Sequence, residues 1–253
     1  IFEDNECVGI NLFSRGSAAG STYGGPASSF IFFGRNRIRF VFGGDQEELT
    51  LDGGFSPYFG KVEASDNSLT FPSDPLYPQW CSPPGHCRDL STNWTGAAAY
   101  VLGGTGQGQL RVFKKGGLAE GLNRTWELEE PFGSDGGVAL GADSLISVFE
   151  RREKCIYRDN LFSDGGPMQL YGGMFHAIVA NNTIERASGL IAEGLNHGKD
   201  TYMPVYFIET LNNRIIDSIS LTGEVAGLSA YGYYNASAKF NGTMAAALVY
   251  RNN

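Results

Sequence analysis

The sequence predicts an all-β fold assembled from repeated strand, turn and strand units. The composition is rich in Gly (35), Phe (17) and Tyr (12), and only 18% of the residues are charged. Gly supplies the positive φ angles of tight turns, and aromatic residues suit the pleated faces of strands. Because 42% of the residues are hydrophobic, the chain can bury a core. We therefore expect more than about 35% strand and less than about 10% helix.

An internal repeat is the second observation behind this fold class. Ala-Glu-Gly-Leu-Asn occurs at 119–123 and again, 73 residues later, at 192–196. Cysteines mark a similar period, since Cys7, Cys81 and Cys155 are spaced by 74 residues each. No linker rich in proline or serine interrupts the chain. The sequence thus predicts a single repeat domain over 1–253, with units at about 7–80, 81–154 and 155–224 and a half unit at 225–253.

Pairs of apolar segments around short turns are the third observation. In 205–221, for example, Val205-Tyr-Phe-Ile208 is followed by Asn212-Asn213 and then by a second apolar segment. Asn and Gly favour the backbone angles of hairpin turns, so each pair predicts a β-hairpin. We expect the hairpins to form a closed, propeller-like arrangement, with a prism, a sandwich or a solenoid as alternatives. The seven predicted hairpins span 30–42, 58–71, 99–113, 138–149, 175–187, 205–221 and 238–250.

The distribution of charge argues against nucleic acid and anionic membranes as partners. The formal net charge is −8, and no basic cluster exceeds the group Arg35, Arg37 and Arg39. A protein that neutralises phosphate groups needs a basic face, which this sequence does not indicate. No apolar run reaches the roughly 18 residues that a membrane span needs. We therefore expect no nucleic acid partner and no membrane span.

Five Asn-x-Ser/Thr sequons and an even number of cysteines (4) predict a secreted, extracellular glycoprotein with disulfide bonds. Chance sequons in a bacterial chain are the alternative. Cys81 and Cys87 enclose two prolines and a glycine that bend the chain enough for a local bridge, which leaves Cys7 to pair with Cys155. The other two pairings stay open. The sequons begin at Asn93, Asn123, Asn181, Asn235 and Asn241.

Residues that usually carry catalysis are scattered along the chain. The three histidines lack the spacing of a helical zinc site, so we expect no metal and no cofactor. No serine lies in a nucleophile motif. Glycoside hydrolysis needs two carboxylates across a cleft, and the sequence offers glutamates for it, but such pairs also arise by chance. The residues concerned are His86, His176 and His197, and Glu127, Glu129, Glu150 and Glu209.

Aromatic side chains on a β scaffold are the remaining functional signal. Trp80, Trp94 and Trp126 could stack on the apolar faces of sugar rings. The competing interpretation is that each of them belongs to the core. We therefore expect binding or adhesion, with lectin-like carbohydrate recognition first and a structural subunit of an extracellular coat or filament second. A secreted glycosidase or polysaccharide lyase is the third hypothesis. The expected partners are carbohydrate, other extracellular proteins or further copies of the chain.

Overall fold

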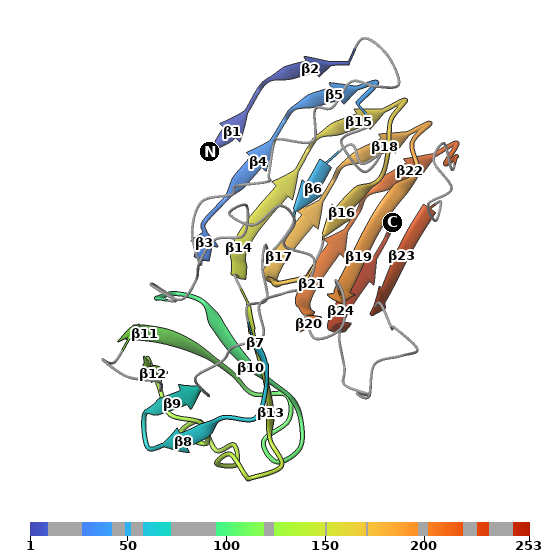
Figure 1. The fold of residues 1–253 in the computed structure, drawn as a ribbon. Coiled ribbons are helices and arrows are strands. Elements are labelled where there is room, and N and C mark those ends of the chain that lie inside the picture. Colours follow the sequence, from blue (N-terminus) through green and yellow to red (C-terminus); the bar gives the residue numbers. More distant parts are fainter. Residues whose placement is uncertain are drawn as a thin grey trace, which may run out of the picture.

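The computed structural model describes residues 1–9, 27–41, 49–51, 58–71, 95–118, 124–149, 151–170, 172–196, 202–219, 227–232 and 245–253. These residues form strands and no helix, and more than half of them lie in strands. The predicted all-β fold is confirmed. The strands form three parallel sheets and one antiparallel sheet beside them (Figure 1). A search of the described residues finds no helix long and apolar enough to cross a membrane.

Sheet 1 contains the longest series of parallel strands. Its order is β1-β4-β14-β17-β21-β24, and β3 also pairs with β14. Its register places Cys155, Ala177, Ile208 and Leu248 on neighbouring strands at one level, and all four face the core. The strands are β1 (Phe2–Glu3), β3 (Ala27–Ser29), β4 (Phe32–Gly34), β14 (Arg151–Arg158), β17 (Met174–Ala180), β21 (Val205–Leu211) and β24 (Ala245–Arg251).

After each longer strand of sheet 1, from β14 to β21, the chain goes on to form a strand of sheet 2 and then a strand of sheet 3. Sheet 2 consists of β2 (Glu6–Val8), β5 (Arg37–Arg39), β15 (Leu161–Ser163), β18 (Thr183–Glu185) and β22 (Arg214–Ile216). Sheet 3 consists of β6 (Leu49–Leu51), β16 (Met168–Leu170), β19 (Gly189–Asn196) and β23 (Gly227–Gly232), and the short β20 (Tyr202–Met203) pairs with β19 in the antiparallel sense.

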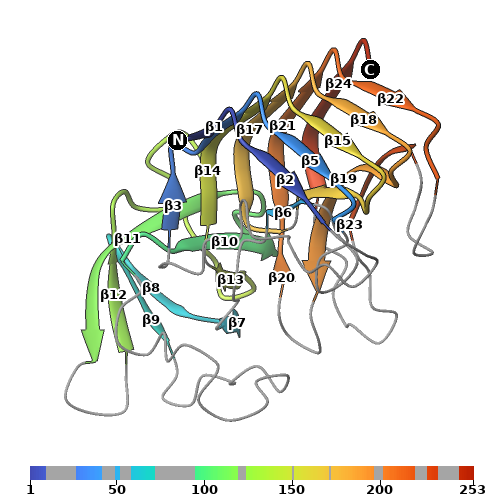
Figure 2. The ribbon, with the colours of Figure 1, turned by 90° about the horizontal axis from the view of Figure 1, so that it is seen from above.

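The chain visits the three sheets in turn. β14, β15 and β16 are followed by β17, β18 and β19, and then by β21, β22 and β23 (Figure 2). We call one such pass a rung; neighbouring rungs are about 4.8 Å apart. At the corner between sheets 2 and 3, Gly189 has a φ of 121° and a Cβ there would lie 1.9 Å from the carbonyl oxygen of Gly227 on the next rung. Only glycine fits this close approach.

The order in which the chain visits the three sheets contradicts most of the predicted hairpins. A hairpin places consecutive strands side by side, whereas here consecutive strands lie in different sheets. The predictions for 30–42, 175–187 and 205–221 are wrong for this reason. The prediction for 138–149 is also wrong, because only β13 forms there. Hairpins are confirmed within 58–71, by the pairing of β8 with β9, and within 99–113, by that of β10 with β11. The first half of 238–250 lies outside the described residues.

The predicted long repeat and its propeller-like closure are not confirmed. The strand that leads to the copy at 119–123 is β11 of the antiparallel sheet, whereas the copy at 192–196 lies in β19 of sheet 3. A propeller needs antiparallel blades, but strands of sheets 1 to 3 pair in parallel. Among the predicted alternatives, this winding is closest to a solenoid. The single domain and its unit boundaries stay predictions.

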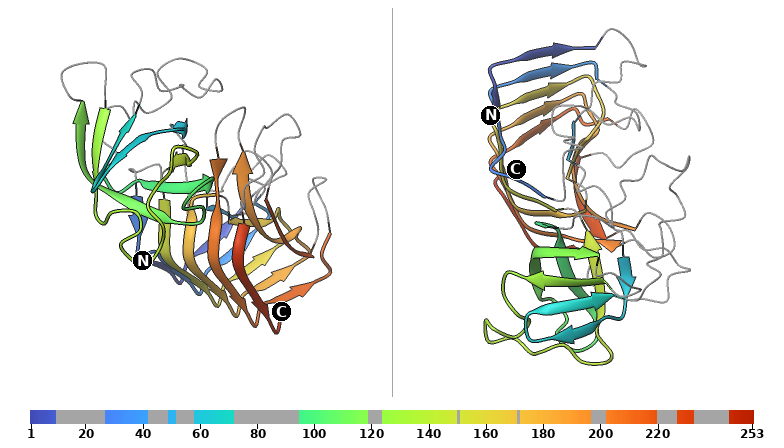
Figure 3. Two further views of the ribbon diagram at one scale, coloured as in Figure 1. Left: turned by 90° about the horizontal axis from the view of Figure 1, so that it is seen from below. Right: turned by 60° about the vertical axis from the view of Figure 1, so that its left-hand side comes forward.

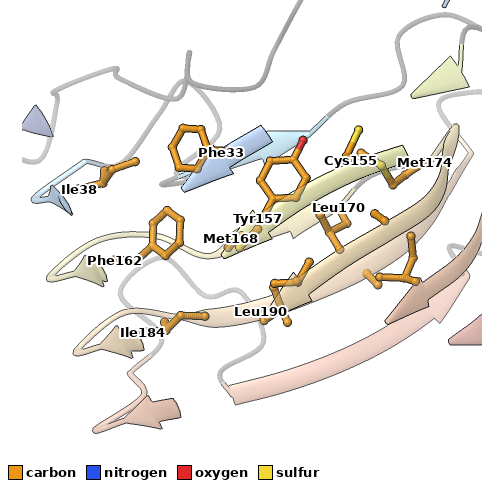
Figure 4. Close-up of a cluster of buried hydrophobic side chains, with 14 of the residues drawn as sticks. Phe33, Ile38, Cys155, Tyr157, Phe162, Met168, Leu170, Met174, Ile184 and Leu190 are labelled. Atoms are coloured by element: carbon orange, nitrogen blue, oxygen red, sulfur yellow. The ribbon is translucent and has the colours of Figure 1, made fainter. Parts of the chain in front are cut away.

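The core of the parallel part lies between sheets 1, 2 and 3. Tyr157 from β14, Phe162 from β15 and Leu170 from β16 are fully buried there (Figure 4). Successive rungs stack equivalent side chains, as with Phe162 over Ile184 in sheet 2. Since side chains alternate along a strand, Met168 and Leu170 of β16 both enter this core. The core therefore grows by one layer with each rung.

A ladder of asparagines forms the corner between sheets 1 and 2. Each rung turns there through a residue with positive φ, such as Asp159 (59°) or Asn181 (57°), and an asparagine follows. The backbone N–H of Asn36 donates to Oδ1 of Asn160 at 2.9 Å, and the N–H of Asn160 donates to Oδ1 of Asn182 at 3.0 Å. These bonds satisfy backbone groups that the turn would leave unpaired. The ladder comprises Asn5, Asn36, Asn160, Asn182, Asn213 and Asn253.

The antiparallel sheet has its own core and packs against sheet 1. Phe71, Phe113 and Trp126 fill its interior. Figure 3 shows it, in green and cyan, beside the parallel sheets. Its order is β7-β13-β10-β11-β12-β9-β8, with β7 (Tyr58–Gly60), β8 (Glu63–Ser65), β9 (Ser68–Phe71), β10 (Ala98–Gly103), β11 (Leu110–Leu118), β12 (Arg124–Leu128) and β13 (Leu145–Phe149).

Candidate functional site

The one predicted sugar-stacking tryptophan that lies within the described residues is part of the core. Trp126 has no exposed surface, and its ring packs on Phe113 with 5.8 Å between the centroids. The sugar-stacking role of Trp126 is therefore wrong, because β12 turns this side chain toward the interior of the antiparallel sheet. Trp80 and Trp94 lie outside the described residues.

The predicted disulfide between Cys7 and Cys155 is not formed. Both residues are free thiols. Cys7 lies on β2 of sheet 2, whereas Cys155 lies on β14 of sheet 1, where its thiol donates to the carbonyl of Glu153 at 3.3 Å. Different sheets on different rungs keep these side chains apart, and burial raises the pKa of the Cys155 thiol. Cys81 and Cys87 lie outside the described residues.

One of the predicted glycosylation sites can be placed. Asn181 is exposed at the corner between sheets 1 and 2, with a φ of 57°, and Thr183 of its sequon begins β18. The prediction put Asn181 at a hairpin tip; it lies at a corner between two sheets instead. Asn93, Asn123, Asn235 and Asn241 lie outside the described residues.

The candidate metal ligands and carboxylates do not form a cluster in the described part of the chain. No group of three or more His, Cys, Asp or Glu residues that could hold a metal ion occurs there. Glu127 lies on β12 and Glu129 just after it, so both belong to the antiparallel sheet, whereas Glu209 lies on β21 of sheet 1. His86, Glu150 and His197 lie outside the described residues.

The feature that sequence reasoning missed is a column of unusual backbone conformations across sheet 1. Five residues at equivalent positions on neighbouring rungs have φ between 52° and 60°: Phe30, Lys154, His176, Phe207 and Ala247. We call them the bulge column. Residues other than glycine adopt this region at a cost of about 1 kcal/mol, and a bulky side chain is especially rare there. Glycine or asparagine would form the same bend at lower cost.

The bulge column changes which side chains face outward. On β17, Met174 enters the core and Phe175 faces outward; after the bend at His176, Ala177 enters the core and Ile178 faces outward. The outward residues before the bend are covered by the antiparallel sheet, and Phe175 is 4% exposed. Those after the bend stay in contact with solvent, as Ile178 does. The column thus marks the border between the covered and the open part of sheet 1.

Two ring contacts run along the bulge column. The ammonium group of Lys154 lies 5.2 Å from the centre of the Phe30 ring, a cation–π contact. The rings of His176 and Phe207 stack with 4.8 Å between centroids and 3° between their planes. This spacing equals the separation of rungs, so each ring lies directly over its neighbour. Phe30 is 74% exposed and Phe207 is 50% exposed.

Phe207 presents an open ring face. His176 covers one side of the ring, and the next rung carries only Ala247 at the equivalent position, a small exposed residue. The ring of Tyr206 also lies 6.1 Å from that of Phe207, and half of Phe207 remains exposed. Glu209 and Val249 follow on the same strands and also face outward. We call the stretch of sheet surface formed by Phe207, Glu209, Ala247 and Val249 the Phe207 notch.

The notch combines an apolar surface with a hydrogen-bond acceptor. An aromatic face attracts the C–H groups of a flat, partly apolar ring, and the carboxylate of Glu209 accepts hydrogen bonds from hydroxyl groups. The Glu209 carboxylate has no ion pair with a described residue. Such a pairing of ring and carboxylate suits a pyranose sugar.

Comparison with known proteins adds no family to this geometry. No protein-family model matches the sequence, and no curated protein is found to be similar to it.

Proposed function

We propose that this protein is a secreted, lectin-like glycoprotein that binds carbohydrate at the Phe207 notch. The observation that carries the proposal is the half-exposed Phe207 ring, which stacks on His176 and is followed on the next rung by the small, exposed Ala247. A sugar ring entering the notch would continue the stack by one further layer. The wild-type chain places phenylalanine and histidine where glycine would bend the backbone more easily, which supports a role for the rings themselves.

Binding is favoured over hydrolysis at this notch. Glycoside hydrolysis needs two carboxyl groups on opposite sides of the scissile bond. Among the described residues, Glu209 is the one carboxylate of the notch, and Glu127 and Glu129 belong to the antiparallel sheet; Glu150 lies outside the described residues. The described residues of the notch therefore support recognition of a sugar, but they do not supply the second carboxyl group that cleavage requires.

A glycan array tests the proposal, with two variants as probes. Phe207→Ala removes the stacking face, and we expect at least about tenfold weaker binding to any glycan that the wild-type protein retains. Phe40→Ala is the matched control, because Phe40 is also exposed (43%) and has a φ of 56°, but lies at the corner after β5. Equal binding by both variants, or no glycan binding by the wild-type protein, contradicts the proposal.

Secretion and glycosylation have a separate test at Asn181. Its exposed corner position leaves the side chain accessible to the glycosylation machinery. We expect mass spectrometry of the protein from its native source to find hexosamine on Asn181, and Asn181→Gln to remove it. An unmodified mass of 27.3 kDa would contradict a secreted glycoprotein.

A further inference from the structure

We infer that copies of this chain stack head to tail, so that the first rung of one copy continues sheet 1 after the last rung of another. The partner is thus a second copy of the same chain. Among the described residues, β1 and β24 are the outer strands of sheet 1, and they lie at opposite ends of the series of rungs (Figure 2). The inference concerns these two strand edges and does not depend on carbohydrate binding.

The asparagine ladder has a direction, and its two ends are complementary. On each rung the backbone N–H of the asparagine donates to Oδ1 of the asparagine on the next rung, from Asn5 through to Asn253. At the first rung, Oδ1 of Asn5 accepts no hydrogen bond from a described residue. At the last rung, the backbone N–H of Asn253 donates to no described residue. The same bond that joins neighbouring rungs can therefore join two copies.

The side-chain amide of Asn5 follows the same rule. In the inner rungs, Nδ2 of the ladder asparagine donates to a carbonyl of the preceding rung, as Asn160 does to Phe33 at 3.1 Å. Nδ2 of Asn5 donates instead to the carbonyl of Glu3 on its own rung, at 2.8 Å. Tyr250 is in register with Phe33, so in a stack its carbonyl takes the position that the preceding rung supplies elsewhere.

The register of sheet 1 also brings opposite charges together at this contact. Phe2 shares a column with Tyr250, and Glu3 shares a column with Arg251. Arg251 is exposed and forms no ion pair with a described residue. Phe2 is 37% exposed, although one side of its ring stacks on Phe33 with 5.0 Å between the centroids. A second copy one rung further on places Glu3 beside Arg251 and Phe2 over Tyr250.

The contact is small, so the association is weak and reversible. It joins Phe2 to Asn5 of one copy with Tyr250 to Asn253 of the other. Sheet 2 does not continue across it, because β22 lies one rung before β24 and leaves a strand position open in front of β2 of the next copy. The two copies use opposite ends of the molecule. Such an interface does not close into a dimer, and further copies can add to it.

Sedimentation velocity of the 253-residue chain over a range of concentrations tests the stacking. We expect the weight-average mass to rise continuously above the monomer mass as the concentration increases. Added salt should reduce this rise, because it screens Glu3 from Arg251. A mass that stays at the monomer value at every concentration, or that levels off at the value of a dimer, overturns the inference. Glycan binding does not enter this measurement, so its outcome is separate from that of the proposed function.

Charge exchange tests the contact itself. Arg251→Glu opposes Glu3 with a like charge, and we expect about fivefold weaker association. Arg158→Glu is the matched control, since Arg158 is an exposed arginine in the same column on the inner strand β14, and it should associate as the wild type does. The double variant Glu3→Arg/Arg251→Glu should restore association.

Circular dichroism checks that each of these variants keeps the strand content of the wild type. Association of Arg251→Glu equal to that of the wild type contradicts the stacking. So does a folded double variant that associates as weakly as Arg251→Glu alone.

Discussion

Asn160 shows how one side chain can hold three rungs together. Its Oδ1 accepts from the backbone N–H and the side-chain Nδ2 of Asn36, at 2.9 and 3.0 Å. Its Nδ2 donates to the carbonyl of Phe33 at 3.1 Å and to Oδ1 of Asn182 at 2.8 Å. All of these groups are buried, so none can turn to water instead.

Replacing Asn160 should therefore be costly. We expect Asn160→Ala to lower the free energy of unfolding by about 3 kcal/mol, because it leaves several buried polar groups without partners. Arg158→Ala, two residues earlier at the end of β14, is the control; its ion pair with Asp159 is exposed, and we expect a change of no more than about 0.5 kcal/mol. Chemical denaturation measures the free energy of unfolding of the two variants. Equal effects of the two variants would show that the ladder does not stabilise the rungs.

The ladder also shows what the sequence could have revealed. Each of its asparagines follows the positive-φ corner residue, as in Asp159-Asn160 and Asn181-Asn182. The separations along the chain are 31, 124, 22, 31 and 40 residues, so no fixed period exists. A search for a constant repeat therefore found the 73-residue recurrence instead of the rungs. The pattern of a corner residue followed by asparagine would have been the better signal.

At the scale of elements, the contact between β10 and β21 predicts that the stability of the fold decreases at alkaline pH. Burial is the main reason that the pKa values of Tyr100 and Tyr206 are raised. In the unfolded chain both titrate near pH 10. Above that pH the unfolded state loses protons that the folded state keeps, so stability falls as pH rises.

We expect the thermal midpoint to decrease above about pH 10, and to decrease less in the double variant Tyr100→Phe/Tyr206→Phe. Some of the decrease should persist, because burial also raises the pKa of Tyr58, to about 12. Thermal unfolding, monitored by circular dichroism between pH 8 and about pH 11, measures this decrease of the midpoint. If the midpoints of the wild type and the double variant decreased equally with pH, the contact between Tyr100 and Tyr206 would not be the cause of the decrease.

Hairpin prediction succeeded or failed element by element for a physical reason. The pattern of two apolar segments around a polar turn is the same for a hairpin and for a corner between two parallel sheets. At 99–113 the turn leads back to an antiparallel partner, whereas at 175–187 Asn181 and Asn182 lead on to another sheet. Whether the segment forms a hairpin or a corner depends on its pairing with a strand distant in the sequence, which the local sequence does not specify.

At the scale of the whole molecule, composition was enough to predict an all-β protein but not its function. Aromatic and glycine content follow from pleated faces and tight corners wherever these occur. The bulge column depends on register across four neighbouring strands of sheet 1 and on positive φ at phenylalanine, histidine and lysine, which these residues rarely adopt. His176 and Glu209 were noted in the sequence for other reasons, and Phe207 was assigned to a hairpin strand.

The measurement that tests the central claim most directly is carbohydrate binding by Ala247→Phe. This substitution removes no group of the notch and fills it with a ring stacked on Phe207. The backbone at Ala247 has a φ of 53°, close to the 57° at which Phe207 itself is accommodated, so the fold should tolerate the change. We predict that the variant unfolds at the same temperature as the wild type or a higher one and no longer binds glycans. Unchanged glycan binding by a folded Ala247→Phe protein would contradict the assignment of the notch as the binding site.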